Sequence, residues 1–450
     1  MHVTQDGGAS WTNVTPPQAP EWCQINCIAS SPFEDGGCYV AATRYKLDDF
    51  HPYLYATSDF GKTWREITGG IDPNWFTRCI RPDPVVKGLL YCGSERTVWM
   101  SYDDGRRWQR LQRSLPITPI TDLCIKDGAL IAATQGRSFW SFDGLEHLRQ
   151  LSAEQALASL HVFDAVTVTQ YPGDDEVVAG KGRNPRKDLR VRFYVGGDAS
   201  APVTERAAIE VKDVDGKVVF TRATDATKDD EKFTVKRGMN EVVVTWKSLE
   251  PKVLDGMILW NGRGRGPRPA PFDYPVTVTL GETTKAAVGR IAPDPRTTAT
   301  AADLQARFRL ARDCSDSVTK AHEAIEAIRS LRTQMQVVVD RTEGDAKTKL
   351  DAKRVEVAAV LTAIEETLYQ TKAKSSQDVL NFPIRLTDKL LGVMSAVDRA
   401  EFGPTVGQTE VAAALIAAIG MQLGSFDAAK KDAVAQFNAL AHELAVPHVK

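Results

Sequence analysis

One segment in the first third of the chain carries side chains that could bind or cleave a sugar. It holds Arg44, Tyr45, Asp48, Asp49, His51 and Tyr53. Glycoside hydrolysis uses two carboxyl groups on either side of the scissile bond or, in sialidases, a tyrosine nucleophile. Two adjacent aspartates cannot span the required separation, so one of them would need a carboxylate partner from elsewhere in the protein. Asp48 and Asp49 are the catalytic candidates, either of them as one member of such a carboxylate pair.

Aromatic and basic side chains in and beyond this segment suit ligand binding, because aromatic rings can stack on sugars and guanidinium groups can bind anions. The ligand-binding candidates are Arg44, Tyr45, His51, Tyr53 and Arg137. Glu95 and Arg96, near the end of a predicted strand, are secondary candidates. The alternative is a loop that its own aromatic contacts and ion pairs order.

Other common chemistries lack their sequence signatures. The chain has no P-loop, G-x-S-x-G, H-E-x-x-H or G-x-G-x-x-G pattern in a usable context, and its seven histidines are scattered. The glycine- and arginine-rich run Gly262–Arg268 precedes no predicted helix, so it does not predict a phosphate-binding loop. It is either a solvated loop or a contact for an acidic partner. We expect no cofactor and no metal site.

A repeated pattern predicts the elements that position these candidates. Ser/Thr-x-Asp-x-Gly-x-x-Trp occurs at Thr4–Trp11, Thr57–Trp64 and Ser101–Trp108, and a worn copy is at Ser141–Gly144. A period of roughly 40–50 residues matches one four-stranded blade of a β-propeller. In each copy the aspartate can accept backbone N–H groups across a tight turn, and the glycine supplies a positive φ.

The tryptophan of each copy can then pack into the seam between adjacent sheets. These roles account for the repeated residues without catalysis. The structural residues are Asp6, Gly8, Trp11, Asp59, Gly61, Trp64, Asp103, Gly105 and Trp108.

The repeated octet is identified as the Asp-box, or BNR, motif. With the segments Ala42–Phe50, Arg81–Tyr91 and Ala133–Trp140, it is similar to the end of the propeller in bacterial sortilin/Vps10-like proteins, which are labelled BNR-repeat glycosyl hydrolases. Leu368–Lys372 and Asn381–Leu386 resemble the helical tail of that family. The resemblance thus covers nearly the whole chain. It implies further blades upstream and a secreted or periplasmic location.

Three blades and a fraction cannot close a ring, because each blade buries its face on its neighbours. The first Asp-box begins at Thr4, so the strands expected to precede it are absent from the sequence. We expect the chain to be the C-terminal portion of a larger protein, whose missing N-terminal blades are its partner. An intact short protein would instead need self-association or another chain to cover its open strands.

The remaining sequence predicts two further domains. Short alternating strands, with a hairpin at Asp215–Gly216, predict an immunoglobulin- or fibronectin-III-like β-sandwich over residues 158–292. Apolar residues at three- and four-residue steps from Leu304 to Val338 predict the first of four antiparallel helices in a bundle over residues 298–450, the last broken near Gly424–Ser425. The partial propeller occupies residues 1–152.

Composition limits the partners. The 450 residues predict roughly three domains, and 56 Lys and Arg against 58 Asp and Glu give a net charge of −2. This balance argues against binding to nucleic acid. The sequence has no apolar stretch of about 18 residues that would predict a membrane span. Met1–Trp11 does not have the form of a signal peptide.

Seven cysteines are too few for a disulfide scaffold. We expect buried thiols in strands, with a Cys23–Cys27 or Cys27–Cys38 disulfide as the alternative in an oxidising compartment.

The favoured function is binding of a peptide or glycan on the propeller, with the other two domains as scaffold. The alternative is a sialidase- or glycosidase-like hydrolase whose main catalytic residues lie in the missing blades.

Overall fold

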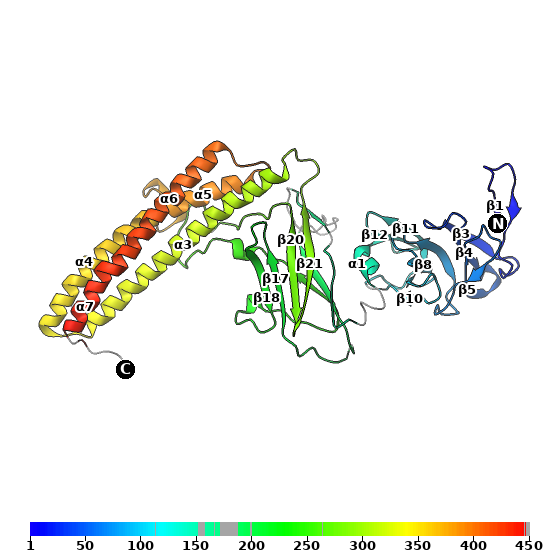
Figure 1. Ribbon diagram of the computed structural model, residues 1–450, viewed down its shortest axis with the longest axis horizontal. Helices are drawn as coiled ribbons and strands as arrows, with labels where there is room; N and C mark the ends of the chain where they lie inside the picture. The colour runs from blue at the N-terminus through cyan, green and yellow to red at the C-terminus, as the bar shows by residue number, and fades with distance from the viewer. Residues whose placement is uncertain are drawn as a thin grey trace. The chain divides into compact units, whose positions relative to one another are not determined.

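The computed structural model describes residues 1–112, 114–151, 158–165, 167–171, 188–198, 200–262, 264–444 and 446. The chain forms two compact units, Met1–Phe163 and Asp164–Lys450. The first unit contains mainly β-sheets, and the second contains β-sheets together with long helices (Figure 1). Residues predicted as separate sandwich and helical domains therefore lie in one compact unit.

Small antiparallel sheets with strands in sequence order make up the first unit. Two sheets have four strands, a hairpin precedes them, and a three-stranded sheet follows. The strands are β1 (His2–Val3), β2 (Thr12–Asn13), β3 (Gln24–Ser30), β4 (Cys38–Arg44), β5 (Asp49–Thr57), β6 (Arg65–Glu66), β7 (Thr77–Pro82), β8 (Leu90–Ser94), β9 (Val98–Ser101), β10 (Gln109–Arg110), β11 (Ile120–Lys126), β12 (Ala129–Thr134) and β13 (Phe139–Asp143). A 3₁₀ turn η1 (Tyr45–Leu47), a short helix α1 (Leu145–Gln150) and β14 (Leu160–Val162) complete the unit.

Consecutive sheets pack on one another through their first strands. β7 contacts β3 and β4 of the preceding sheet, and β11 contacts β7 and β8. One apolar cluster around Leu54 and Ile80 fills the first seam, and another around Leu123 and Leu130 fills the second. Stacked four-stranded meanders are the arrangement of propeller blades, so the predicted blade-like architecture is present.

The Asp-box turns have the hydrogen bonds that their sequence predicts. Asp59 accepts from the Thr57 hydroxyl at 2.8 Å and from the Thr63 N–H at 2.9 Å. Hydrogen bonds from the Thr63 N–H and hydroxyl lower the pKa of Asp59 to about 2. Asp6 and Asp103 accept the corresponding N–H groups at 2.9 and 2.8 Å. These carboxylates therefore have a structural role.

Each later Asp-box rests on the preceding sheet through its glycine. A Cβ added at Gly61 would lie 2.6 Å from Val14, and one at Gly105 would lie 2.8 Å from Ile67. Trp108, which is 5% exposed, donates its indole N–H to the Ile67 carbonyl at 2.6 Å. Val14 and Ile67 both stand three residues after an Asp-box tryptophan, so the same contact recurs between successive sheets.

The first Asp-box lacks this neighbour. Among the described residues, no atom lies within 4 Å of a Cβ built at Gly8, and Trp11 is 61% exposed. The prediction that every Asp-box tryptophan packs into a seam is therefore wrong for Trp11, because none of the described sheets covers its side of the hairpin.

The cysteines are all free thiols, so neither alternative disulfide forms. Cys79, Cys92 and Cys314 are buried, and burial raises the pKa of the Cys79 thiol to about 12. Cys124 is exposed, contrary to the expectation of buried thiols, because it points away from the seam that Leu123 fills.

Two sheets form the β part of the second unit. A five-stranded sheet has the order β15-β21-β20-β17-β18, and β16 pairs with β19. Alternate residues such as Val191, Phe193 and Val195 are buried, and Gly216 in the predicted hairpin has φ 75°. The strands are β15 (Val168–Thr169), β16 (Arg190–Val195), β17 (Ala207–Lys212), β18 (Val218–Ala223), β19 (Gly238–Val243), β20 (Phe272–Leu280) and β21 (Thr283–Ala292). The immunoglobulin-like topology stays a prediction.

Long helices follow the sheets, and α3 packs against α4, α5 and α6 around a shared apolar core. The elements are α3 (Ala301–Asp340), α4 (Gly344–Leu368), α5 (Leu386–Arg399), α6 (Val406–Ala429), a π-helical turn η5 (Lys430–Val434) and α7 (Ala435–Glu443), with 3₁₀ turns η2 (Asp229–Glu231), η3 (Lys247–Leu249) and η4 (Ser376–Leu380). Thr300 and Thr405 form capping boxes at α3 and α6. The predicted α3 stripe is buried from Leu304 to Ile328, whereas Leu331 and Val338 are only partly buried.

The final helix differs from its prediction in two respects. Helical structure continues through Gly424 and Ser425, and the irregularity lies at the π-helical turn instead. By length and composition alone, Val406–Glu443 is also apolar enough to cross a membrane, although no comparable stretch was expected. Few residues of its most apolar stretch are buried. The buried ones include Ala412, Ile419 and Phe426, which belong to the apolar core shared with α3 and α4.

Polar contacts join the helices to the sheets of the second unit. The fully buried Asp213 carboxylate forms an ion pair with Arg312 of α3 and accepts the Asp215 and Lys217 N–H groups at 2.9 Å. The Ser315 hydroxyl donates to the Leu249 carbonyl at 2.7 Å. The hairpin between β17 and β18 is thereby fixed to α3.

Replacing Trp108 by Ala should destabilise the first unit by about 3–5 kcal/mol, the usual cost of removing a buried tryptophan. Trp11→Ala, the matched change in the exposed Asp-box, should alter stability by no more than about 0.5 kcal/mol. Hydrogen exchange of the β8–β10 amides in the full chain measures both effects. Equal losses of amide protection in the two variants would contradict the assignment of Trp108 to the seam.

Arg312→Met should destabilise the second unit by about 3–5 kcal/mol, because it leaves the Asp213 carboxylate buried without its cation. Arg309→Met is the control, since Arg309 forms a more exposed ion pair with Asp215, worth about 1 kcal/mol or less. Denaturant unfolding followed by exchange of the β17–β18 amides separates the two. Similar effects would show that burial of Asp213 does not govern this junction.

Candidate functional site

Strand order brings five connections to one end of the blade-like sheets, opposite the Asp-box turns. The connections are β4–β5, β6–β7, β8–β9, β10–β11 and β12–β13, and we call them together the loop end. Backbone hydrogen bonds link neighbouring connections: Glu95 N–H donates to the Phe76 carbonyl at 3.1 Å, and Thr118 N–H donates to the Arg96 carbonyl at 3.3 Å. The loop end is therefore a continuous surface built from segments far apart in sequence.

Four sequence-predicted residues form a network within this surface. Asp49 accepts from the Tyr53 hydroxyl at 2.8 Å and from Arg44 at 3.4 Å. The His51 N–H donates to the other oxygen of the same carboxylate at 3.2 Å. Four candidate residues of the sequence analysis, Arg44, Asp49, His51 and Tyr53, thus form one contact group. The catalytic role of Asp49 and the ligand-binding role of the other three stay predictions.

The electrostatics of this network do not suit acid catalysis. Burial alone would raise the pKa of Asp49, but the hydrogen bonds from Tyr53, the His51 backbone and Arg44 outweigh it, so its pKa lies below the ordinary value. A catalytic acid needs a raised pKa. Burial and then the hydrogen bond to Asp49 raise the pKa of Tyr53 to about 12, which disfavours a phenolate nucleophile.

The second catalytic candidate, Asp48, lies just outside the network. It follows η1 with φ 61°, its N–H donates to the Tyr45 carbonyl, and its side chain is exposed. The two adjacent aspartates therefore have different roles, because Asp49 is held by hydrogen bonds and Asp48 ends the turn.

Aromatic rings stack where two neighbouring sheets meet. Tyr45 lies parallel to Phe76 with ring centroids 4.8 Å apart, and the Arg78 guanidinium lies 5.0 Å from the Phe76 centroid. Arg78 also donates to Glu95 at 2.7 and 3.0 Å. Tyr45 thus anchors the β4–β5 connection to the next sheet, and Arg78 is neutralised by Glu95.

A second cluster places two arginines on one tryptophan. The guanidinium carbon of Arg110 lies 4.3 Å from the Trp75 centroid, and that of Arg96 lies 5.2 Å away. Trp75 also packs against Trp99 with centroids 5.8 Å apart. Both arginines are exposed, and within the described ranges neither forms an ion pair with a carboxylate. This cluster can attract an anionic group.

Only some of the residues at the loop end were candidates from the sequence. Arg137 lies in the β12–β13 connection, and no contact joins its side chain to the Asp49 network in the described structure. Trp75, Arg78 and Arg110 were missed. The alternating strand direction of a meander could have indicated them, because it places every second connection at the same end.

No metal centre emerges at the loop end. Across the residues whose positions are described, no three His, Cys, Asp or Glu side chains are close enough to hold a metal ion. The arrangement offers guanidinium groups and aromatic rings, which bind ligands through charge and stacking.

The sequence matches no protein-family profile and no curated protein. Solved structures that resemble the chain include YCF48 bound to a D1 peptide, with 12% identity, 64% of this chain and 74% of that chain covered, and a TM-score of 0.26. A GH74 enzyme of Niastella koreensis has 12% identity, 59% and 38% coverage and a TM-score of 0.22. YCF48 from Cyanidioschyzon merolae has 10% identity, 62% and 75% coverage and a TM-score of 0.21.

The chain spans well under half of the GH74 enzyme. The blade-like assignment depends on the sheet order and the Asp-box contacts described above.

Asp49→Asn should lower stability at neutral pH by weakening the network. Because folding lowers the pKa of Asp49 below its ordinary value of 3.8, the stabilisation is complete above pH 3.8 and disappears as the pH falls through the lowered pKa. The difference from wild type should therefore shrink in acid. Urea unfolding at several pH values measures it. Asp48→Asn should have little effect at any pH, and a constant Asp49→Asn difference would contradict the assigned role.

Proposed function

We propose that the loop end binds an extended peptide or glycan that carries anionic groups. The observation that carries this proposal is the cluster of Arg96 and Arg110 on Trp75. Stacking on an aromatic ring orients a guanidinium while its N–H edge stays available to a carboxylate or phosphate. Arg78 also lies over an aromatic ring, that of Phe76, but Glu95 neutralises its charge. The positive charge without a carboxylate partner is therefore concentrated at Trp75.

The same stacking favours an anionic ligand over a neutral sugar. A sugar stacks on an open aromatic face, whereas Trp75 has two guanidinium groups near its ring and Trp99 beside it. Arg137 extends the positive charge to the third sheet. An extended ligand crossing the connections from β6–β7 to β12–β13 would meet these groups in turn.

In this proposal the chain is the C-terminal part of a sortilin/Vps10-like BNR-repeat protein that is secreted or periplasmic. A further sheet of the same repeat would cover the open side of the first Asp-box. The support is the contact pattern itself, because Gly61 and Gly105 each rest on a preceding sheet while Gly8 faces open space in the described part of the chain. The second unit would serve as scaffold.

A sialidase- or glycosidase-like activity is the alternative function. The observation that favours it is the Tyr53 hydroxyl bonded to the Asp49 carboxylate, which resembles the tyrosine and carboxylate pair that sialidases use. The pKa of Tyr53 near 12 disfavours a phenolate nucleophile, and the lowered pKa of Asp49 disfavours a role as the catalytic acid.

Fluorescence titration of the full chain tests the binding function with three probes: an oligoglutamate peptide, an oligogalacturonate and a neutral cello-oligosaccharide. We expect saturable binding of at least one acidic probe and none of the neutral one. Trp75→Ala and Arg110→Gln should each weaken that binding roughly tenfold or more, since each removes a charge-assisted or stacking contact.

Arg107→Gln is the matched control, because Arg107 is equally exposed but lies in an Asp-box turn at the opposite end of the sheet. Its affinity should equal that of wild type. Failure of both acidic probes, or equal weakening by Arg107→Gln, would refute a specific site. Turnover of a labelled glycoside that Asp49→Asn or Asp48→Asn abolishes would replace binding with hydrolysis.

A further inference from the structure

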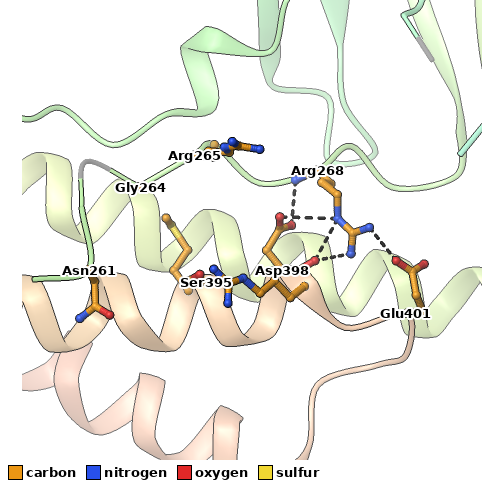
Figure 2. A pocket seen from close by; sticks show the side chains of 10 residues that line it. Asn261, Gly264, Arg265, Arg268, Ser395, Asp398 and Glu401 are labelled. Atoms are coloured by element: carbon orange, nitrogen blue, oxygen red, sulfur yellow. Dashed lines mark hydrogen bonds and ion pairs between the residues drawn. The ribbon is translucent and has the colours of Figure 1, made fainter. Parts of the chain in front are cut away.

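A cavity of about 720 Å³ lies in the second unit between helix α5 and the loop that carries the glycine- and arginine-rich run. Arg265 and Arg268 line it from the loop, and Ser395, Asp398 and Arg399 line it from the helix. Figure 2 shows the loop on one side of the cavity and Ser395 on the other. No residue of the loop end takes part. The volume falls within the range of about 300–1,000 Å³ that is typical of small-molecule sites.

The loop is fixed to α5 at both ends of this cavity. At the first end, Asp388 accepts the Trp260 N–H at 2.8 Å and the Asn261 N–H at 3.0 Å. At the second end, the Arg268 N–H donates to Asp398 at 2.8 Å and the Arg268 guanidinium donates to Glu401 at 2.7 Å. These two anchors hold the described residues of the loop against the helix, so the cavity is a built feature of the fold.

Close packing of Gly264 against α5 supports the loop between its two anchors. Gly264 has φ 71°, and a Cβ at this position would lie 2.9 Å from Leu391 and 3.0 Å from Met394. A larger residue would push the loop away from the helix and change the cavity. Gly264 is thus required by the close approach of this loop to α5.

The charges around the cavity do not balance. Arg268 engages both carboxylates, Asp398 and Glu401, as the dashed lines in Figure 2 show. Arg307, which is only 1% exposed, shares the Ala400 carbonyl with Arg268. Arg265 and Arg399 are exposed, and no hydrogen bond or ion pair to either guanidinium exists among the described residues. Of the three arginines that line the cavity, Arg268 therefore engages both lining carboxylates, and Arg265 and Arg399 remain without one in the described part of the chain.

A structural explanation covers only part of this charge. Arg399 ends α5, where a cation is favoured by the helix dipole. Arg268 donates to the carbonyls of Asp398 and of Ala400, which follows the helix, and Arg307 donates to that of Ala400. Arg265 belongs to the loop and does not interact with the end of α5 in the described structure. Its unpaired guanidinium beside the cavity has no structural partner in the part of the chain that is described.

We propose that the cavity binds a small molecule through an oxyanion group, a phosphate or a carboxylate, held between Arg265 and Arg399. Guanidinium groups form strong, directional hydrogen bonds with such oxyanions. The Ser395 hydroxyl lines the same cavity and can donate to the ligand. The anchors at Asp388 and Arg268 hold the two walls in place, which lowers the conformational cost of binding.

Isothermal titration calorimetry of the full chain with inorganic phosphate and with citrate tests this site. We expect saturable binding of at least one probe, and Arg265→Gln and Arg399→Gln should each weaken it roughly tenfold. Binding of phosphate alone would indicate a phosphorylated ligand, and binding of citrate alone would indicate a carboxylate ligand. Trp75→Ala, which tests the loop end, should leave this affinity unchanged.

Arg385→Gln is the matched control, because Arg385 is an exposed arginine at the other end of α5 and does not line the cavity. Wild-type affinity in this variant supports a local site. Equal weakening by Arg385→Gln would show general charge attraction and would overturn the proposal. Lack of saturable binding by both probes would overturn it too, provided that circular dichroism shows a folded protein.

Discussion

Burial of apolar surface between neighbouring sheets is the constraint on which the first unit depends. A four-stranded meander has two faces, and each must be covered by another element. The Asp-box turn provides the corner at which this happens, since its glycine lets Val14 or Ile67 of the preceding sheet approach within contact distance. The buried Trp108 then joins the two sheets through its hydrogen bond to Ile67. At Gly8 no such neighbour lies within contact distance among the described residues, so the same motif is open there.

This constraint also separates structural from functional residues. The Asp-box aspartates accept hydrogen bonds from their own turns, so their charges are satisfied locally. The opposite end of each sheet has no such turn, and its connections can hold the arginines and aromatic rings of the loop end. The structural turns and the proposed binding surface therefore lie at opposite ends of the same sheets.

In the second unit, polar contacts as well as apolar burial hold neighbouring elements together. Its sheets and helices meet through polar contacts, of which the buried Asp213–Arg312 ion pair and the anchors of the loop on α5 are the main examples. A buried ion pair of this kind adds little net stability but strongly opposes separation of its partners. The same contacts that fix the helices also shape the cavity at Arg265, so its two walls are rigidly related.

The sequence by itself determined the features that depend on nearby residues. The Asp-box turns, the hairpin at Gly216 and the α3 stripe were predicted because their hydrogen bonds or periodic contacts join positions a few residues apart. The segment that holds the Asp49 network was found for the same reason, although its hydrogen bonds were not predicted. Tertiary structure alone decided the rest. Trp75, Arg96 and Arg110 meet only because of strand order, Trp11 is exposed because no sheet covers it, and Gly424 stays helical inside α6. Contacts between distant segments depend on how whole elements pack, and a local pattern does not contain that information.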